Sequence, residues 1–213
     1  MIAAIIGSTG LTGSLLIRRL LAEAAITRVV SVSRRPVGES SPKLSELLID
    51  DLDELPSHKS ELAADLYFCC LGTTIGAAGS QEKFAKVDHT AVVAFARIAA
   101  AQNARSLTLV SAMGANEKSR IFYNRIKGRA EADVQSLGLK SLIIFRPALL
   151  VGPRVEVRPA ERIAARTLVP LARILPRRVG KRIVTKADVL ATRMLEEGKA
   201  ARPGVHFIAA ADI

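Results

Sequence analysis

The amino-acid sequence predicts an α/β protein in which a mostly parallel sheet is covered by helices on both faces, a doubly wound arrangement. Six short apolar segments recur along the 213 residues, and most are separated by segments with helical periodicity. The apolar segments are nearly continuous, which is typical of parallel strands buried on both faces. Strands that alternate with helices therefore favour a parallel sheet between two helical layers.

The predicted strands are the runs "MIAAIIG", "RVVSVS", "ELLID", "DLYFCCLG", "SLTLVSA" and "SLIIFRPALLVG". Helices are expected over 11–24 and 81–103, which are rich in alanine and leucine, and over the polar, lysine-containing segment 117–137. No internal repeat is present, so we expect one domain over 1–213. Within it, the Pro- and Arg-rich residues 153–180 are expected to form a small lobe on the substrate side.

The formal net charge is +11, and nine Lys and Arg residues lie between Arg154 and Arg182. Such a segment could attract nucleic acid, or it could border a substrate entrance and favour anionic substrates. Arginines at helical spacing describe a solvated helix face equally well. No zinc-finger spacing or aromatic-rich RNA motif accompanies the charge, so we predict no specific nucleic-acid partner and no metal site.

Three features predict a cytoplasmic protein with no membrane partner. Arg146 interrupts the last apolar run well before the ~18 residues that a membrane span needs. No basic region precedes the first apolar segment, which argues against a secretory signal. Cys69 and Cys70 are adjacent, which is poor geometry for a stabilising disulfide and fits a reducing compartment.

The first strand runs into "GSTGLTG", with glycines at Gly7, Gly10 and Gly13. A strand that turns tightly into a helix presents unpaired N–H groups at the helix N-terminus, where they attract a phosphate. Small residues allow that phosphate to approach the backbone. The spacing G-x-x-G-x-x-G is a variant of the dinucleotide fingerprint, and a glycine-rich turn without a ligand is the alternative.

The second strand ends in Ser33, Arg34 and Arg35, and the first acidic residue after it is Glu39. An Asp or Glu at this strand end would bind the 2′-hydroxyl of NAD. Two guanidiniums favour a 2′-phosphate instead, because they bind it through charge-assisted, bidentate hydrogen bonds. This position predicts NADP(H) as the cofactor, and a pair of surface arginines without a ligand is the alternative.

Two further strand ends are expected beside the cofactor. The third strand would place Asp51 and Leu52 near the adenine, and the fourth would bring Leu71, Gly72 and Thr73 alongside the dinucleotide. The signal is weak at both places, since Gly72 could simply end a buried strand.

Tyr123 and Lys127 lie four residues apart in "YNRIKGRAE". On a helix this spacing places both side chains on one face, where the ammonium would favour the phenolate form of the tyrosine. Upstream, Ser111 follows the strand "SLTLV", and its hydroxyl could hold a substrate carbonyl beside the phenol. The alternatives are a chance spacing of Tyr and Lys and an ordinary serine at a turn.

Taken with the motifs "FCCLGTT", "SAMGA" and "FRPALLVGPR" and with their order, these features resemble the short-chain dehydrogenase/reductase superfamily. The Ser–Tyr–Lys set of that superfamily matches Ser111, Tyr123 and Lys127. More narrowly, the chain looks like the atypical subgroup that includes the Tat-interacting protein and its bacterial relatives.

The resemblance implies a Rossmann fold that binds NADP(H) across the carboxyl ends of the strands. Carried over residue by residue, it assigns the glycine turn to Gly7, Ser8, Thr9, Gly10, Leu11, Thr12 and Gly13. It assigns the 2′-phosphate site to Ser33, Arg34 and Arg35, and the nicotinamide side to Tyr123, Lys127 and Pro147. The asparagine that many members carry on the helix after the fourth strand has no clear equivalent, and Asp88 or His89 lies in that neighbourhood.

The function expected from these features is NADPH-dependent reduction of a carbonyl group in an unidentified small molecule. Tyr123 would donate the proton, Lys127 would support the phenol and anchor the nicotinamide ribose, and Ser111 would orient the carbonyl. The alternative is an NADP(H)-binding sensor or interaction protein with little turnover. As in many members of the superfamily, the helix expected from about Glu117 could supply the surface of a homodimer.

Overall fold

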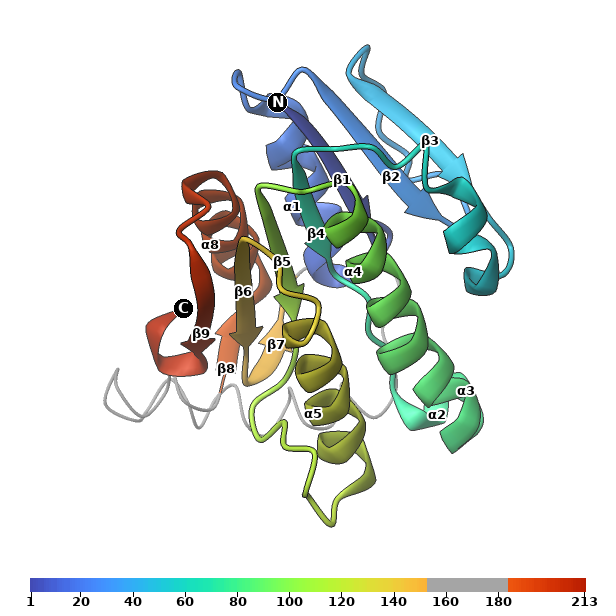
Figure 1. Ribbon diagram of the computed structural model, residues 1–213, viewed down its shortest axis with the longest axis vertical. Coiled ribbons are helices and arrows are strands. Elements are labelled where there is room, and N and C mark those ends of the chain that lie inside the picture. Colours follow the sequence, from blue (N-terminus) through green and yellow to red (C-terminus); the bar gives the residue numbers. More distant parts are fainter. Residues whose placement is uncertain (153–183) are drawn as a thin grey trace.

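A parallel sheet forms the centre of the structure, a computed structural model that describes residues 1–152 and 184–213. Its strands are β1 (Ile2–Ile6), β2 (Arg28–Ser33), β3 (Leu44–Leu48), β4 (Leu66–Cys69), β5 (Ser106–Val110), β6 (Ser141–Arg146) and β9 (Gly204–Ala209). They lie in the order β3-β2-β1-β4-β5-β6-β9, and each strand runs parallel to its neighbours (Figure 1).

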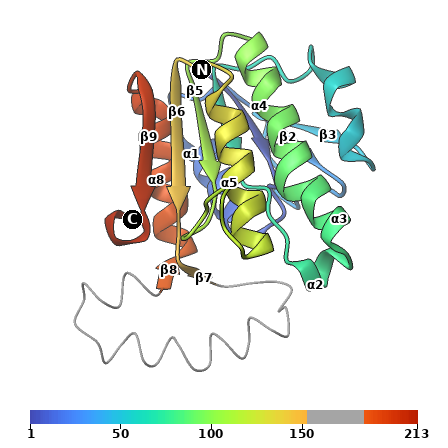
Figure 2. The same cartoon turned by 60° about the horizontal axis from the view of Figure 1, so that its bottom comes forward.

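Helices cover both faces of this sheet. They are α1 (Leu11–Ala22), α2 (Ile75–Ala78), α3 (Gln81–Ala85), α4 (Val92–Ala101), α5 (Phe122–Gln135) and α8 (Ala187–Ala200). α1 and α8 pack on one face, and α4 and α5 pack on the other (Figures 1 and 2). The predicted fold class, a doubly wound and mostly parallel Rossmann-like sheet, is confirmed.

The central strands are buried on both sides because neighbouring side chains point to opposite helical layers. On β4, Tyr67 packs edge-on against Phe95 of α4, with the ring centroids 5.4 Å apart. Phe68 points the other way, toward α8, where a Cβ on Gly198 would lie 2.8 Å from its ring. The continuous apolar character of this strand thus reflects two separate cores.

The predicted helix over 81–103 is not continuous. After α3, the residues Lys86–Ala91 form a turn of π-helix, designated η2, before α4 begins. A π turn widens the helix locally, and such turns are frequent at functional sites.

The helix expected over 117–137 begins later, at Phe122. Gly128 explains the difference, because a Cβ there would lie 2.2 Å from the backbone of Asn116 and Glu117. The segment before the helix therefore folds back against α5, where the Asn116 N–H donates to the Asn124 carbonyl at 3.0 Å. A helix that started at Glu117 could not make this contact.

The last predicted strand is divided at Pro147, after which β7 (Leu149–Val151) pairs with β8 (Val184–Lys186) in a separate parallel pair. Sequence patterns also failed to identify β9, the last strand of the sheet, and α8, which packs on one face of it. The lobe expected over 153–180 and the basic segment from Arg154 to Arg182 lie outside the described residues. In the part of the chain that is described, no helix is long and apolar enough to cross a membrane.

Candidate functional site

The parallel order of the sheet gathers the candidate site residues at one edge. Each of them follows the carboxyl end of a strand or lies on the helix after it, and these ends all face the same side (Figure 2). In open α/β sheets, ligands bind outside the carboxyl ends of the strands.

The glycine turn after β1 is tightly constrained. Gly7 has a φ of +80°, and a Cβ there would lie 2.6 Å from the backbone of Cys70, at the end of β4. A Cβ on Gly13 would lie 2.1 Å from the carbonyl oxygen of Gly7, so the first turn of α1 sits directly on the strand end. Side chains are excluded at both positions because the backbone itself fills the space.

The N-terminus of α1 is open to a ligand. Gly10 is the N-cap and supplies no side-chain hydrogen bond to the first turn, which contains no acidic residue. Within this turn the hydroxyl of Thr12 is buried and has no hydrogen-bond partner among the described residues. Uncapped N–H groups, an orphaned hydroxyl and a turn free of side chains fit a dinucleotide pyrophosphate.

Of the other residues of the turn, one is buried and holds the turn in place, and the rest are exposed or half-buried. Ser8 is buried and shares a hydrogen bond of 2.7 Å with Ser31 of β2. Thr9 and Gly10 are exposed, and Leu11 is half-buried. The turn is thus anchored to the second strand at Ser8, while its tip faces outward.

Arg34 and Arg35 are exposed at the end of β2, where they follow the buried Ser33. The Ser33 hydroxyl donates to the Arg35 carbonyl at 2.7 Å, which fixes the turn. Glu39, the first acidic residue after the strand, accepts a hydrogen bond of 2.6 Å from Arg18 of α1. The region is therefore basic, and its nearest carboxylate in sequence already has a cationic partner.

Asp51 and Leu52 lie after β3, at the start of the 3₁₀ helix η1 (Leu52–His58). Asp51 is the N-cap of this helix and accepts from the Asp53 N–H at 3.0 Å. Lys86, from η2, binds both carboxylates, at 3.0 Å to Asp51 and 2.8 Å to Asp53. This exposed cluster joins the β3 edge of the site to the helix that follows β4.

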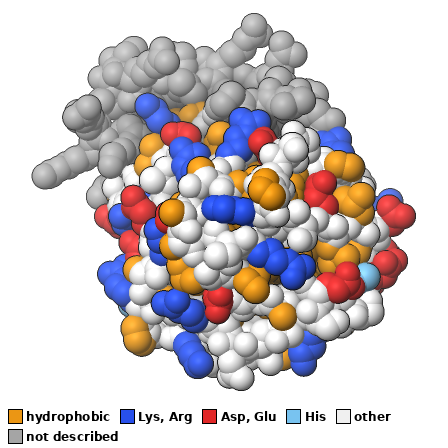
Figure 3. Space-filling view, turned by 90° about the horizontal axis from the view of Figure 1, so that it is seen from above, with side chains coloured by type: hydrophobic (Ala, Val, Ile, Leu, Met, Phe, Trp, Pro, Cys, Tyr) orange, Lys and Arg blue, Asp and Glu red, His pale blue; other side chains and the backbone are white. Residues whose placement is uncertain are grey.

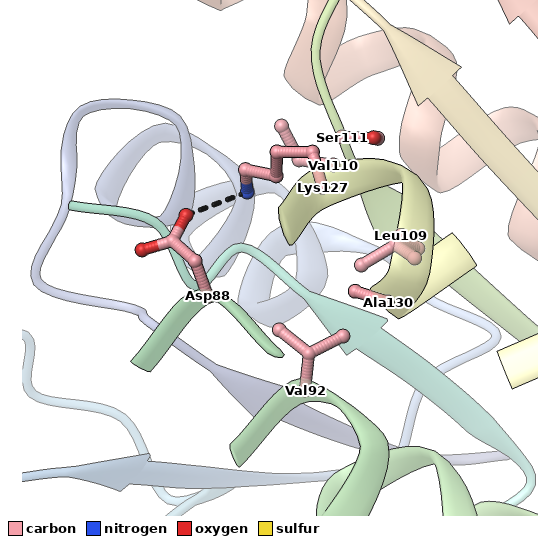
Figure 4. Close-up of a pocket in the computed structure, with 7 residues that line it drawn as sticks. All are labelled: Asp88, Val92, Leu109, Val110, Ser111, Lys127 and Ala130. Atoms are coloured by element: carbon pink, nitrogen blue, oxygen red, sulfur yellow. Dashed lines mark ion pairs between the residues drawn. The ribbon is translucent and has the colours of Figure 1, made fainter. Parts of the chain in front are cut away.

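A small pocket lies at the end of β5, where η2 and α4 approach α5 (Figure 4). It is lined by Asp88, Val92, Leu109, Val110, Ser111, Lys127 and Ala130. Two of the three predicted catalytic side chains, Ser111 and Lys127, are therefore brought together. The Ser111 hydroxyl is buried and, in the described ranges, lacks a hydrogen-bond partner, so its hydrogen-bonding capacity is unused in this structure.

Lys127 is almost fully buried and forms an ion pair of 2.8 Å with Asp88, which is 0% exposed (Figure 4). The other carboxylate oxygen of Asp88 accepts from the Thr73 N–H at 2.9 Å. Gly72 is part of the same arrangement, because a Cβ there would lie 3.7 Å from both the Asp88 oxygen and the Lys127 nitrogen. The predicted loop of Leu71, Gly72 and Thr73 is thus joined to α5 through Asp88.

The charge of Lys127 is held by its surroundings. Burial opposes it, but the Asp88 carboxylate and the Tyr123 phenol outweigh burial and raise the pKa of Lys127 above its usual value. Tyr123 lies one turn before Lys127 on α5 and is half-buried against Phe84, with ring centroids 5.4 Å apart. Tyr123 and Lys127 thus lie on the same helix one turn apart, and the effect of the ammonium on the phenol stays a prediction.

Pro147 lies at the end of β6, on the far side of β5. Its carbonyl accepts from the Met113 N–H at 2.9 Å, and the Ser111 N–H donates to the Phe145 carbonyl at 2.7 Å. These two bonds tie the chain that leaves β5 to β6, which fixes the backbone at Ser111.

Sequence reasoning did not choose between Asp88 and His89 at the position of the missing asparagine. The structure turns Asp88 into the site, whereas His89 pairs with Asp133 on the surface at 2.7 Å. A signal was present, since Asp88 lies four residues from both Phe84 and Val92 and so falls on the buried face of its helix. A charged residue on that face needs a buried partner.

On the face shown in Figure 3, the Lys and Arg side chains of the described residues are interspersed with Asp, Glu and hydrophobic ones. Among the described residues, no group of three or more His, Cys, Asp or Glu is placed to hold a metal ion.

The fold is similar to that of solved nicotinamide-dinucleotide enzymes. The Bordetella bronchiseptica enzyme WbmH in complex with NAD⁺ superposes with a TM-score of 0.74 at 15% identity, over 96% of this chain and 74% of its own. An oxidoreductase of the short chain dehydrogenase/reductase family from Burkholderia thailandensis superposes with a TM-score of 0.69 at 18% identity, over 99% and 91%.

Sequence similarity identifies a narrower family. The mitochondrial protein fmp52 of Emericella nidulans is 37% identical over 76% of this chain and 72% of its own length. The mitochondrial protein fmp52-1 of Aspergillus terreus is 34% identical over 94% and 88%. The chain belongs to the fmp52 family. No general protein-family profile matches it.

These relatives correct one prediction. The cytoplasmic location expected from the sequence is wrong, because the matching relatives are named as mitochondrial proteins. The adjacent cysteines on which the prediction partly rested could not separate these two compartments.

Proposed function

We propose that the protein is an NADP(H)-dependent oxidoreductase that reduces a carbonyl group of a small molecule. One observation carries the proposal: Lys127 is buried and charged in the pocket that Ser111 also lines, where the Ser111 hydroxyl has no partner among the described residues, and Tyr123 lies one helical turn away. A buried ammonium, a phenol and a free hydroxyl at the ligand-binding edge of a Rossmann sheet suit general acid catalysis.

The cofactor would lie across the carboxyl ends of the strands. The glycine turn and the N-terminus of α1 would hold its pyrophosphate, and the loop at Leu71, Gly72 and Thr73 would line its path toward Lys127 and Pro147. When bound, the nicotinamide supplies a hydride. The protein's own groups supply the positioning and the proton.

The 2′-phosphate is the basis for preferring NADP(H) to NAD(H). Arg34 and Arg35 are exposed at the strand end where an acidic residue would bind the 2′-hydroxyl of NAD(H). Glu39, the first acidic residue after this strand, is already paired with Arg18. Asp51 and Leu52 are assigned to the adenine side on their position alone.

In the proposed reaction, Ser111 donates a hydrogen bond to the substrate oxygen and fixes its orientation. Tyr123 transfers its proton to that oxygen as negative charge develops there, and Lys127 stabilises the phenolate that remains. The Lys127 ammonium would also hold the nicotinamide ribose when the cofactor is bound. Ser111 lacks a described protein partner, which agrees with a hydroxyl reserved for substrate.

The resemblance to the Tat-interacting protein subgroup supports the same proposal at a finer level. The proposal also includes a small-molecule substrate and a homodimer whose interface is formed by α5. Anionic substrates remain a hypothesis, because the basic segment that suggested them lies outside the described residues.

The test is NADPH oxidation over a panel of aldehydes, ketones and quinones, with the wild type and with Tyr123→Phe. The substitution removes the proposed proton donor and keeps the ring, so NADPH binding should survive while reduction falls by roughly 10²–10⁴-fold. Tyr67→Phe is the matched control, because Tyr67 is buried beside α4 and its hydroxyl donates to the Leu62 carbonyl.

Full activity of Tyr123→Phe on a confirmed substrate would refute the catalytic assignment. A wild type that binds NADPH and reduces nothing in the panel would favour the sensor alternative. A wild type that binds no nicotinamide dinucleotide at all would end both proposals.

A further inference from the structure

Asp88 has a position that the proposed reaction leaves unexplained. It is fully buried, sits on the π turn η2, and contacts two elements that would flank the cofactor. One carboxylate oxygen pairs with Lys127 of α5 and the other accepts the Thr73 N–H of the loop after β4. A buried carboxylate is costly, so both contacts are needed to stabilise it.

We propose that Asp88 is a positioning residue that keeps the buried Lys127 ammonium charged and joins it to the loop after β4, so that α5 and this loop form one cofactor-facing unit. A neutral amide at this position could still accept the Thr73 N–H, but it would not compensate the lysine charge. The ion pair makes the Asp88–Lys127 unit neutral overall, which is what a site closed to water tolerates.

Within the described residues, the groups that act on Lys127 come from three elements. Asp88 contributes from η2, Tyr123 from α5 and Cys69 from β4. Burial raises the pKa of the Cys69 thiol to about 11, so the thiol stays neutral below that pH. Of the three, Asp88 alone is in direct contact with the ammonium, at 2.8 Å.

The inference can be tested without cofactor, through the pH dependence of stability. In Asp88→Asn, burial of Lys127 is no longer opposed by a carboxylate, so the lysine pKa falls below its unfolded value. The variant then releases a proton on folding, and its stability rises with pH relative to the wild type. The denaturation midpoint of Asp88→Asn should lie below that of the wild type. We expect this difference in midpoint to shrink by about half or more when the pH is raised from about 7 to about 9.5.

The measurement is best made in a Tyr123→Phe background, which removes the titration of the phenol. Glu131→Gln is the matched control, because Glu131 is buried on the same helix and pairs with Arg146 at 2.5 Å. An arginine does not lose its proton in this range, so the difference in denaturation midpoint between Glu131→Gln and its parent should not change with pH. If the difference for Asp88→Asn is also independent of pH, the proposal is overturned.

A second variant covers the case in which Asp88→Asn is unfolded at pH 7. Asp88→Asn with Lys127→Met removes both charges, and it should be more stable at pH 7 than Asp88→Asn alone and show no pH-dependent difference in midpoint. A double variant that is less stable than the single one would overturn the proposal. Unfolding of Asp88→Asn at every pH would do so too, since a neutral lysine has no need of its carboxylate.

The cofactor-facing part of the inference rests on the proposed function. Asp88→Asn should bind NADPH more weakly than the wild type, and this loss of affinity should be about tenfold larger at about pH 9 than at about pH 7. The reason is that Lys127 loses its charge in the variant as the pH rises. Glu131→Gln should show no such pH profile. An unchanged profile in Asp88→Asn would refute this part, whereas a wild type that does not bind NADPH would refute the proposed function and leave the cofactor-free result standing.

Discussion

At the scale of single residues, the proposed preference for NADP(H) rests on the two guanidiniums after β2. On that proposal, replacing Arg34 and Arg35 together by alanine removes two charge-assisted contacts to the 2′-phosphate. We expect NADPH binding to weaken by about 2–4 kcal/mol and NADH binding to change little. Titration of each cofactor by calorimetry measures both effects.

Arg97→Ala provides the control for that experiment, because Arg97 is exposed on α4 and its loss changes only the overall charge. It should leave the affinities for both cofactors unchanged. Equal affinities of the wild type for NADPH and NADH would contradict the assignment of the two arginines.

Burial also separates the two lysines of the site. Lys127→Met leaves the Asp88 carboxylate buried without its cation, so we expect a loss of about 3–5 kcal/mol in the free energy of unfolding. Lys86→Met breaks ion pairs with exposed partners, Asp51 and Asp53, and should cost far less because solvent screens these charges. Urea denaturation of both variants at neutral pH makes the comparison, and equal losses would argue against a buried dyad.

At the scale of elements, the strand–turn–helix unit of β1 and α1 depends on one close backbone approach. Gly13→Ala would place a Cβ 2.1 Å from the Gly7 carbonyl oxygen, whereas Gly10→Ala would place one at 3.3 Å. We expect Gly13→Ala to lose about 1–3 kcal/mol of stability and to weaken dinucleotide binding, because α1 must move off the strand.

Gly10→Ala should cost less than Gly13→Ala in both measurements. Thermal unfolding and an NADPH titration of the two variants test this order. A Gly13→Ala variant as stable as the wild type would show that the helix can shift without penalty.

The elements differ in how far their sequences predicted them. The strands β1, β2 and β5 were found at nearly their observed bounds, because continuous apolar runs depend only on local burial. The start of α5 was missed, since it depends on Gly128 accepting a distant segment of backbone. The break between α3 and α4 was missed because alanine-rich periodicity hides one π turn.

The candidate site shows the same limit. Ser111, Tyr123 and Lys127 could be selected from spacing and from strand ends, because parallel strands bring their carboxyl ends to one edge. Asp88 could not be assigned a role, because its role depends on Lys127 and Thr73, which approach it only in the folded chain. Sequence patterns thus predict the location of the site more readily than the charge balance inside it.

At the scale of the whole molecule, one sheet joins two cores. Tyr67 and Phe68 are neighbours on β4, yet Tyr67 belongs to the core under α4 and Phe68 to the core under α8. Because both cores share the strands, neither helical layer can lose its packing without weakening the sheet that supports the other.

We therefore expect a single unfolding transition for the described parts of the chain. Phe68→Ala removes a fully buried ring and should lower the free energy of unfolding by about 3–5 kcal/mol. Val189→Ala, at a side chain that is 39% exposed on α8, is the control and should cost far less. Tyrosine fluorescence in a Tyr123→Phe background reports on Tyr67, and circular dichroism reports on the helices. Both signals should change at the same denaturant concentration, although Phe68 faces the core opposite to Tyr67.

Two separate transitions, with the midpoint of only one of them lowered by Phe68→Ala, would show that the two layers unfold independently and that the chain does not behave as one domain.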